Sequence, residues 1–290
     1  MGRWRLVLAG VSVGVLATLS TAAAAAPDPA TPARWPVAAG QWTLQLPKDL
    51  QRLEFHGELN VDQGAAGGGA MMYPAPSLAG FLAAVLTHAA LVESSKSAQR
   101  DKALAEADQT LQPLAPALEA LSPTALSAAV APLLGAAPQP AWQVEVAPVY
   151  VFSRDLRSLS VESHLLLRRA AADEVLARTA VRATAAPLAA ERVPAGWTDN
   201  DGQALRQTAA QLLVQAVTAG LRSLAGDWDQ ATAPQRTVRY PFGGGERIER
   251  VQVLESRCEG AVVRHLRGDL MVIPWRDPSR AGECPPSDRP

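Results

Sequence analysis

The sequence predicts an α+β fold: an antiparallel sheet covered on one face by a long amphipathic helix and by Ala-rich helices, followed by a small C-terminal β module. Two observations lead to this expectation. Three segments between residues 142 and 182 alternate apolar and polar side chains, which is typical of strands with one buried and one solvent-exposed face. Residues 203–224 then repeat apolar side chains at helical spacing, and a helix with such a stripe needs an apolar sheet face to cover.

The first 26 residues have the pattern of an export signal. Arg3 and Arg5 give a short positive start, Leu6–Leu19 is apolar, and the alanines up to residue 26 suit a signal peptidase. A retained membrane anchor is the alternative, although the apolar stretch is short for a membrane span. We therefore expect a bacterial protein that is periplasmic or secreted, with no transmembrane segment once residues 1–26 are removed. Residues 27–40, rich in Pro and Ala, should form a disordered leader.

The α+β domain is expected over residues 41–228, and its first part combines two strands with a set of helices. The strands are predicted at 42–46 and 53–61. Pro113 and Pro116 interrupt the second helical stretch, which is therefore kinked or divided in two. The helical stretches are predicted at 77–92, 97–121 and 122–135.

The second part of the domain contains the three alternating strands and the long helix. The helix is expected to begin after Asp199 and Asn200 and to end at Gly226, because these residue types favour helix starts and stops. Leu213 and Val217 should lie at the centre of the helix–sheet interface, whereas Arg206 and Arg222 should point towards solvent. The strands are predicted at 142–151, 159–168 and 175–182.

The C-terminal region, 236–276, reads as a small antiparallel β module of short strands separated by glycine turns. A polar, Pro-rich tail follows at 277–290. Cys258 and Cys284 are the only two cysteines. In an oxidising compartment an isolated pair of this kind is most often a disulfide, and two thiols alone would make an incomplete metal site. We therefore predict a bridge that ties the tail to the module.

The balance of charge excludes one class of partner. The chain has 27 Lys and Arg against 28 Asp and Glu, a net charge of −1, and no cluster of basic residues. Proteins that bind nucleic acid usually carry a basic patch, so we expect no nucleic-acid partner.

One group of residues is a candidate metal site. Glu54, His56 and Glu58 alternate along the solvent-exposed face of the second strand, and Glu162 and His164 do the same on the strand at 159–168. If those two strands were neighbours, imidazole and carboxylate groups suitable for zinc or another divalent metal would meet on one surface. Solvation of polar side chains on exposed strand faces is the alternative interpretation.

These patterns favour a non-catalytic protein of the bacterial cell envelope that binds another protein or a cell-wall component. The chain has no Gly-x-Ser-x-Gly elbow, no His-Glu-x-x-His and no Cys-x-x-Cys, which are common local signatures of catalysis. We expect no cofactor. A periplasmic hydrolase or a metal-dependent enzyme, with an active site assembled from scattered residues, is the alternative.

Overall fold

The computed structural model of this chain describes residues 42–58, 101–134, 142–169 and 174–278. Several predictions concern residues outside these ranges. They are the export signal at 1–26, the leader at 27–40, the helix at 77–92, and the part of the tail from residue 279 onward, which includes Cys284.

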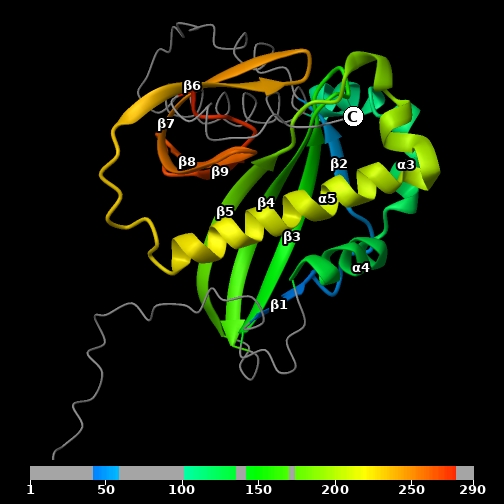
Figure 1. Ribbon diagram of the computed structural model, residues 1–290. Helices are drawn as coiled ribbons and strands as arrows, with labels where there is room; N and C mark the ends of the chain where they lie inside the picture. Colours follow the sequence, from blue (N-terminus) through cyan, green and yellow to red (C-terminus); the bar gives the residue numbers. More distant parts are fainter. Residues whose placement is uncertain (1–41, 59–100, 135–141, 170–173, 279–290) are drawn as a thin grey trace, which may run out of the picture. The chain divides into compact units, whose positions relative to one another are not determined.

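The described strands form one sheet of nine strands (Figure 1). Eight of them follow the spatial order β1-β3-β4-β5-β9-β8-β7-β6, and β2 pairs with β3 on the edge that β1 also occupies. Within each of two groups, β3-β4-β5 and β6-β7-β8-β9, neighbouring strands are antiparallel. The bounds are β1 Trp42–Gln45, β2 Glu54–Gly57, β3 Trp142–Phe152, β4 Leu159–Arg169, β5 Val175–Thr184, β6 Gln235–Phe242, β7 Gly245–Arg257, β8 Gly260–His265 and β9 Leu270–Ile273.

The predicted fold class is wrong in its sheet, although the α+β class is confirmed. The sheet is mixed, because β1 and β2 run parallel to β3 and β9 runs parallel to β5. The C-terminal strands are part of the same sheet and do not form a separate module. They join it where Val181 of β5 pairs with Leu270 of β9. Alternation indicates which side chains share a face, but it does not indicate which strands are neighbours or in which direction they run.

The long helix, α5 (Ala195–Leu224), lies across β3, β4 and β5 in Figure 1 and covers one face of these strands. Residues 199–202 have non-helical backbone angles, so the regular part begins at Gln203, as predicted. Leu213 and Val217 are fully buried, which confirms their predicted place in the helix–sheet interface. At Gly220 an added Cβ would lie only 3.0 Å from Leu165, so glycine allows the helix to approach the sheet closely.

Tyr150 of β3 fastens the sheet to the helix through its hydroxyl group. The hydroxyl donates a hydrogen bond to the carbonyl oxygen of Ala209 at 3.1 Å, and the side chain is fully buried. This burial raises the pKa of Tyr150 far above its ordinary value, because the ionised phenolate would be separated from water. The hydroxyl therefore stays protonated and remains a donor.

A second hydrophobic core lies on the opposite face of the sheet from α5. Because paired strand residues share a face, Leu270 faces α5 beside Val181, and its neighbour Met271 points to the other side. Met271 belongs to the second core, which the four C-terminal strands and the segment after them enclose among themselves. Its buried members are Val238, Tyr240, Phe242, Val251, Ala261, Val263, Met271, Ile273 and Trp275.

The turn between β6 and β7 lies against the turn between β3 and β4. The backbone N–H of Gly243 donates to the hydroxyl of Ser158 at 2.8 Å, across 85 residues of sequence. Partial burial acts to raise the pKa of Asp155, but hydrogen bonds from the Ser153 hydroxyl and from the N–H groups of Arg157 and Gly244 outweigh it and hold this pKa below its ordinary value. The ionised form of Asp155 therefore holds the two turns together.

The remaining described helices pack beside α5. Residues 101–109 are helical, and the backbone then passes through η1 (Gln112–Leu114), α3 (Ala115–Ala120) and α4 (Pro123–Leu134), as the prediction of a divided helix requires. α3 and α4 both contact α5. In the described part of the chain no single helix is both long enough and apolar enough to span a membrane. Gln112–Ala120 and Pro123–Leu134, bent by 69°, meet that test only when taken together.

The expectation that Arg222 points into solvent is wrong. Its guanidinium donates to Asp227 at 2.8 Å and to Glu255 of β7, and it lies 4.8 Å from the centre of the Trp228 ring. Partial burial acts to raise the pKa of Glu255, but hydrogen bonds from Arg257 and Arg222 keep it below its ordinary value. Arg222 therefore connects the end of α5 to the C-terminal strands.

Candidate binding site

The five residues predicted as metal ligands do not converge. β3 lies between β2 and β4, so the strands that carry them are not neighbours. Glu54 and Glu162 both lie beside Val149 of β3, in one row across the sheet. His56 is in register with Val151 and His164 with Ala147, which puts the two histidine Cα atoms about 16 Å apart from standard strand spacings. Two imidazole groups at that separation are too distant to share one metal ion.

Three of these five residues have other partners. His56 lies with Nδ1 3.2 Å from the carboxylate of Asp108, in the helical segment before η1, and Glu162 pairs with Arg182 at 2.5 Å. Glu58 pairs with Arg247 of β7. His164 is exposed. Over the described ranges no group of three or more His, Cys, Asp or Glu side chains is arranged to hold a metal ion.

The pairs in this region connect parts of the sheet that are distant in sequence. Glu58, directly after β2, and Arg247 are separated by 189 residues. Arg247 also lies over the ring of Phe242, with its guanidinium carbon 3.6 Å from the ring centre. Burial, as the largest influence, raises the pKa of the neighbouring Tyr240. The Glu58–Arg247 pair therefore connects the C-terminal strands to the end of β2.

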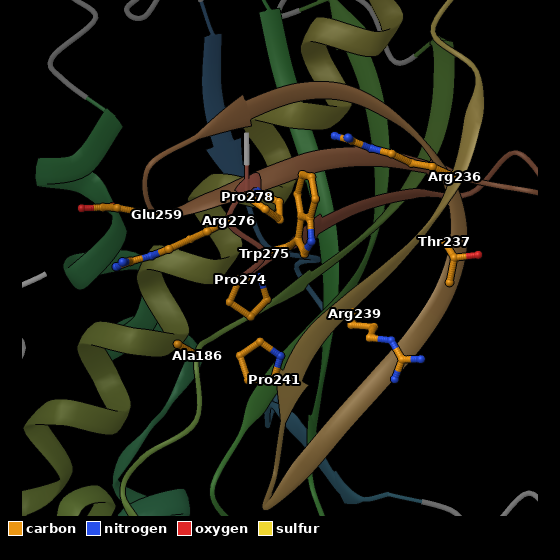
Figure 2. A pocket seen from close by; sticks show the side chains of 10 residues that line it. All are labelled: Ala186, Arg236, Thr237, Arg239, Pro241, Glu259, Pro274, Trp275, Arg276 and Pro278. Atoms are coloured by element: carbon orange, nitrogen blue, oxygen red, sulfur yellow. The ribbon is translucent and has the colours of Figure 1, made fainter. Parts of the chain in front are cut away.

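A hollow of about 800 Å³ lies where β6 approaches the segment that follows β9 (Figure 2). We call it the C-terminal hollow. Four of its residues come from β6, four from the segment after β9, one from the β7–β8 turn and one from the segment after β5. They are Arg236, Thr237, Arg239, Pro241, Pro274, Trp275, Arg276, Pro278, Glu259 and Ala186.

The base of the C-terminal hollow is apolar and well fixed. Trp275 is buried in the second core, and the guanidinium of Arg236 lies 4.6 Å from the centre of its ring. Arg236 also donates to the carboxylate of Asp277 at 2.9 Å, so its charge is largely balanced. Figure 2 shows Pro274 next to Trp275, and Pro241 on the far side of Pro274. Prolines and a buried indole give a base with little conformational freedom.

The sides of the hollow carry charges with weak partners or none. Figure 2 shows Glu259 and Arg276 on one side and Arg239 on the other. The carboxylate of Glu246 is 3.9 Å from Arg239, and both side chains are more than half exposed, so this contact is weak. Arg276 and Glu259 are exposed and form no ion pair within the described ranges. The hollow thus combines an apolar base with charged groups that are available to a ligand or another chain.

Sequence reasoning missed this site because its residues come from four separate segments. Arg236 and Arg239 lie at the strand that was expected to begin the C-terminal module, without any motif. The segment from 277 was expected to be loose, yet Asp277 is fixed by Arg236. The usable signal was Trp275 between Pro274 and Pro278, since a tryptophan is seldom left in a loose segment.

The chain has no detectable similarity to a known protein family, to a characterised protein or to a solved structure.

Proposed function

We propose that this chain is an exported, non-catalytic protein of the bacterial cell envelope, and that it binds a protein or an envelope component through the C-terminal hollow. The export signal pattern at residues 1–26 supports the location. After removal of that segment the protein would act in the periplasm or outside the cell.

The composition of the hollow is the observation that carries the binding function. Its base is apolar and rigid, and Arg239 and Arg276 are exposed beside it without a strong partner in the described part of the chain. A binding surface combines an apolar centre with charged groups at its margin. By contrast, most of the acid–base side chains considered for catalysis are engaged in pairs that hold the sheet together, such as Glu58 with Arg247.

The predicted disulfide would lie beside the C-terminal hollow. Cys258 and Glu259 form the turn between β7 and β8, and Glu259 lines the hollow. A bridge from Cys258 to Cys284 would tie the tail beside the hollow in an oxidising compartment. We propose that this bridge forms on export.

Photo-crosslinking in intact cells tests the binding function. A photoreactive phenylalanine analogue replaces Arg239, and in a control protein it replaces Gln211, which is exposed on α5. We expect one envelope component to be captured at position 239 and not at position 211. Equal capture, or none, at the two positions would contradict binding through the hollow.

A metal assay distinguishes the alternative enzyme. Protein purified without added metal should contain no stoichiometric zinc or manganese if binding is the only function. Stoichiometric metal, held by ligands other than a shared pair of His56 and His164, would favour a metal-dependent enzyme and contradict the proposal.

A further inference from the structure

The C-terminal hollow opens along one edge of β6. This strand pairs with β7 on one side, and no described strand pairs with it on the other. Arg236 lies against Trp275 of the second core, whereas the next residue, Thr237, is on the opposite face of the strand. Both residues line the hollow. A hollow that is lined from both faces of one strand lies along its edge, where a ligand can reach the backbone.

The turn after β6 determines which backbone groups point away from β7. Phe242 and Gly245 are paired across a two-residue turn, so they form a hydrogen-bonded pair. Pro241 is therefore at a position that does not bond to β7, where its missing N–H leaves no gap in the pairing. Bonded and non-bonded positions alternate, and the register has no shift along β6. The other residues with outward N–H and C=O groups are Gln235, Thr237 and Arg239. In the described part of the chain these groups have no hydrogen-bond partner.

The charges beside this edge are mainly positive. Arg239 has only its weak contact with Glu246. Arg250 of β7 is in register with Thr237 and so shares a face with Arg239, and it is exposed and forms no ion pair within the described ranges. Arg276 lies on the other side of the hollow (Figure 2). A strand added beside β6 should therefore carry acidic side chains. The same charges disfavour a second copy of this chain, because pairing of two β6 strands would bring two groups of arginines together.

We propose that the C-terminal hollow binds an extended, acidic segment of another protein, which pairs with β6 as an additional strand. This inference rests on the proposed function and specifies a polypeptide as the ligand. The outward N–H and C=O groups recur at every second residue, about 7 Å apart, which matches the repeat of another extended polypeptide. Backbone pairing provides affinity, and alternate side chains of the segment reach the apolar base at Trp275 and the charge of Arg239.

The test titrates the purified full chain with the labelled peptide Glu-Val-Glu-Val-Glu-Val-Glu and measures fluorescence anisotropy at about 0.15 M salt, where distant charges are screened. One matched probe has lysine in place of glutamate, and another has its backbone N–H groups methylated. We expect the acidic peptide to bind roughly tenfold more tightly than either. Equal binding of the methylated peptide would exclude strand pairing, and equal binding of the lysine peptide would exclude the acidic class. No binding of the acidic peptide would also overturn the proposal.

Variants and hydrogen exchange locate the bound peptide. Arg239→Glu should weaken binding of the acidic peptide roughly tenfold. Arg178→Glu makes the same change of charge at an exposed position of β5 outside the hollow, and it should have little effect. Equal losses would mean that the peptide responds only to net charge. In the wild-type chain the peptide should slow exchange of the outward amides of Thr237 and Arg239, with little change at Val238. Unchanged exchange at the two outward amides would place the peptide elsewhere and contradict the proposal.

This inference and the proposed function can fail separately. Capture of a partner at position 239 in cells, with no binding of the acidic peptide, would retain binding through the hollow and reject the additional strand. Peptide binding without capture in cells would reject the envelope partner and retain β6 as a peptide-binding edge. Sedimentation of the chain without peptide provides a further check. A dimer that fails to bind the acidic peptide would identify a second copy as the occupant and overturn the proposal.

Discussion

The two groups of antiparallel strands bury their apolar side chains in different ways. β3, β4 and β5 are covered by α5, and their core includes long side chains of both layers, such as Leu165 and Leu213. Among the described residues, the second core of β6–β9 is formed by these strands themselves and by Trp275. One group therefore gains stability mainly from helix–sheet packing, whereas the other has a smaller core and depends on additional connections.

This difference explains where the polar connections are found. Arg222 with Glu255, Glu58 with Arg247, and Asp155 with the β6–β7 turn all join the C-terminal strands to the rest of the molecule. A group of strands with a small core is expected to open at a lower free energy than the α5-covered group. Substitutions in the two groups should therefore have effects of different size.

The largest effect is expected at the centre of the α5 interface. Leu213→Asp would bury a charge without a partner, and we expect a loss of about 4–5 kcal/mol or more, with little soluble protein. Gln211→Asp, on the exposed side of the same helix, should be nearly neutral. Soluble yield and urea unfolding measure both. Similar losses for the two variants would mean that the helix face is assigned incorrectly.

The disulfide should have the next largest effect, concentrated in the C-terminal group. With 25 residues between the cysteines, the bridge should contribute about 3 kcal/mol in the chain-entropy account. Reduction should therefore speed hydrogen exchange in β6–β9 and leave β3 and β4 largely unchanged. Thiol titration provides the control, and two reactive thiols in protein taken from the periplasm would refute the bridge.

Two buried tyrosines give a smaller, direct comparison of the groups. The Tyr150 hydroxyl donates to Ala209, so Tyr150→Phe should cost about 1 kcal/mol and leave a buried acceptor without its partner. The Tyr240 hydroxyl is buried in the second core and has no hydrogen bond of normal geometry to the described residues, although the side chain of Arg247 lies close to it, so Tyr240→Phe should cost less than Tyr150→Phe. Denaturant midpoints decide this, and an equal cost for both would show that Tyr240 is satisfied.

The sequence allowed the prediction of most elements but not of their arrangement. The alternation in β3, β4 and β5 and the stripe of α5 were sufficient to locate these elements, because one buried face imposes its period on the residues. The same pattern could not show that β1 and β2 share an edge of β3. It also could not show that β9 pairs with β5, since only four residues form that strand and every one is apolar.

The candidate sites show the same limit. Glu54 and Glu162 do share a row of the sheet, as the alternation suggested, but Val149 separates them. In β7 a bulge between Val253 and Glu255 shifts the alternation, so the face of each later residue is reversed. The C-terminal hollow depends on tertiary proximity of four segments, and among them only Trp275, between Pro274 and Pro278, gives a local sequence signal.

The smallest predicted effect is a pH dependence at the junction of the two turns. Because the pKa of Asp155 is lower in the folded protein, its contribution to stability is present above the unfolded-state pKa, about 4, and is lost as the pH falls through the folded-state pKa. Wild-type protein should therefore lose more stability than Asp155→Asn as the pH is lowered through this range. Thermal unfolding midpoints of the two proteins measure the difference as a function of pH. If the two midpoints fall in parallel, ionised Asp155 does not stabilise the fold.

The central structural claim is that the C-terminal strands complete one mixed sheet through β5 and β9. Amide hydrogen exchange of the full protein tests it most directly, because β5 is an interior strand in this arrangement and β6 is an edge strand. The account predicts slow exchange for amides of Val181–Ala183 and Leu270–Val272, and faster exchange in β6. Rapid exchange in both β5 and β9 would show that these strands are not paired, and would contradict the single nine-stranded sheet.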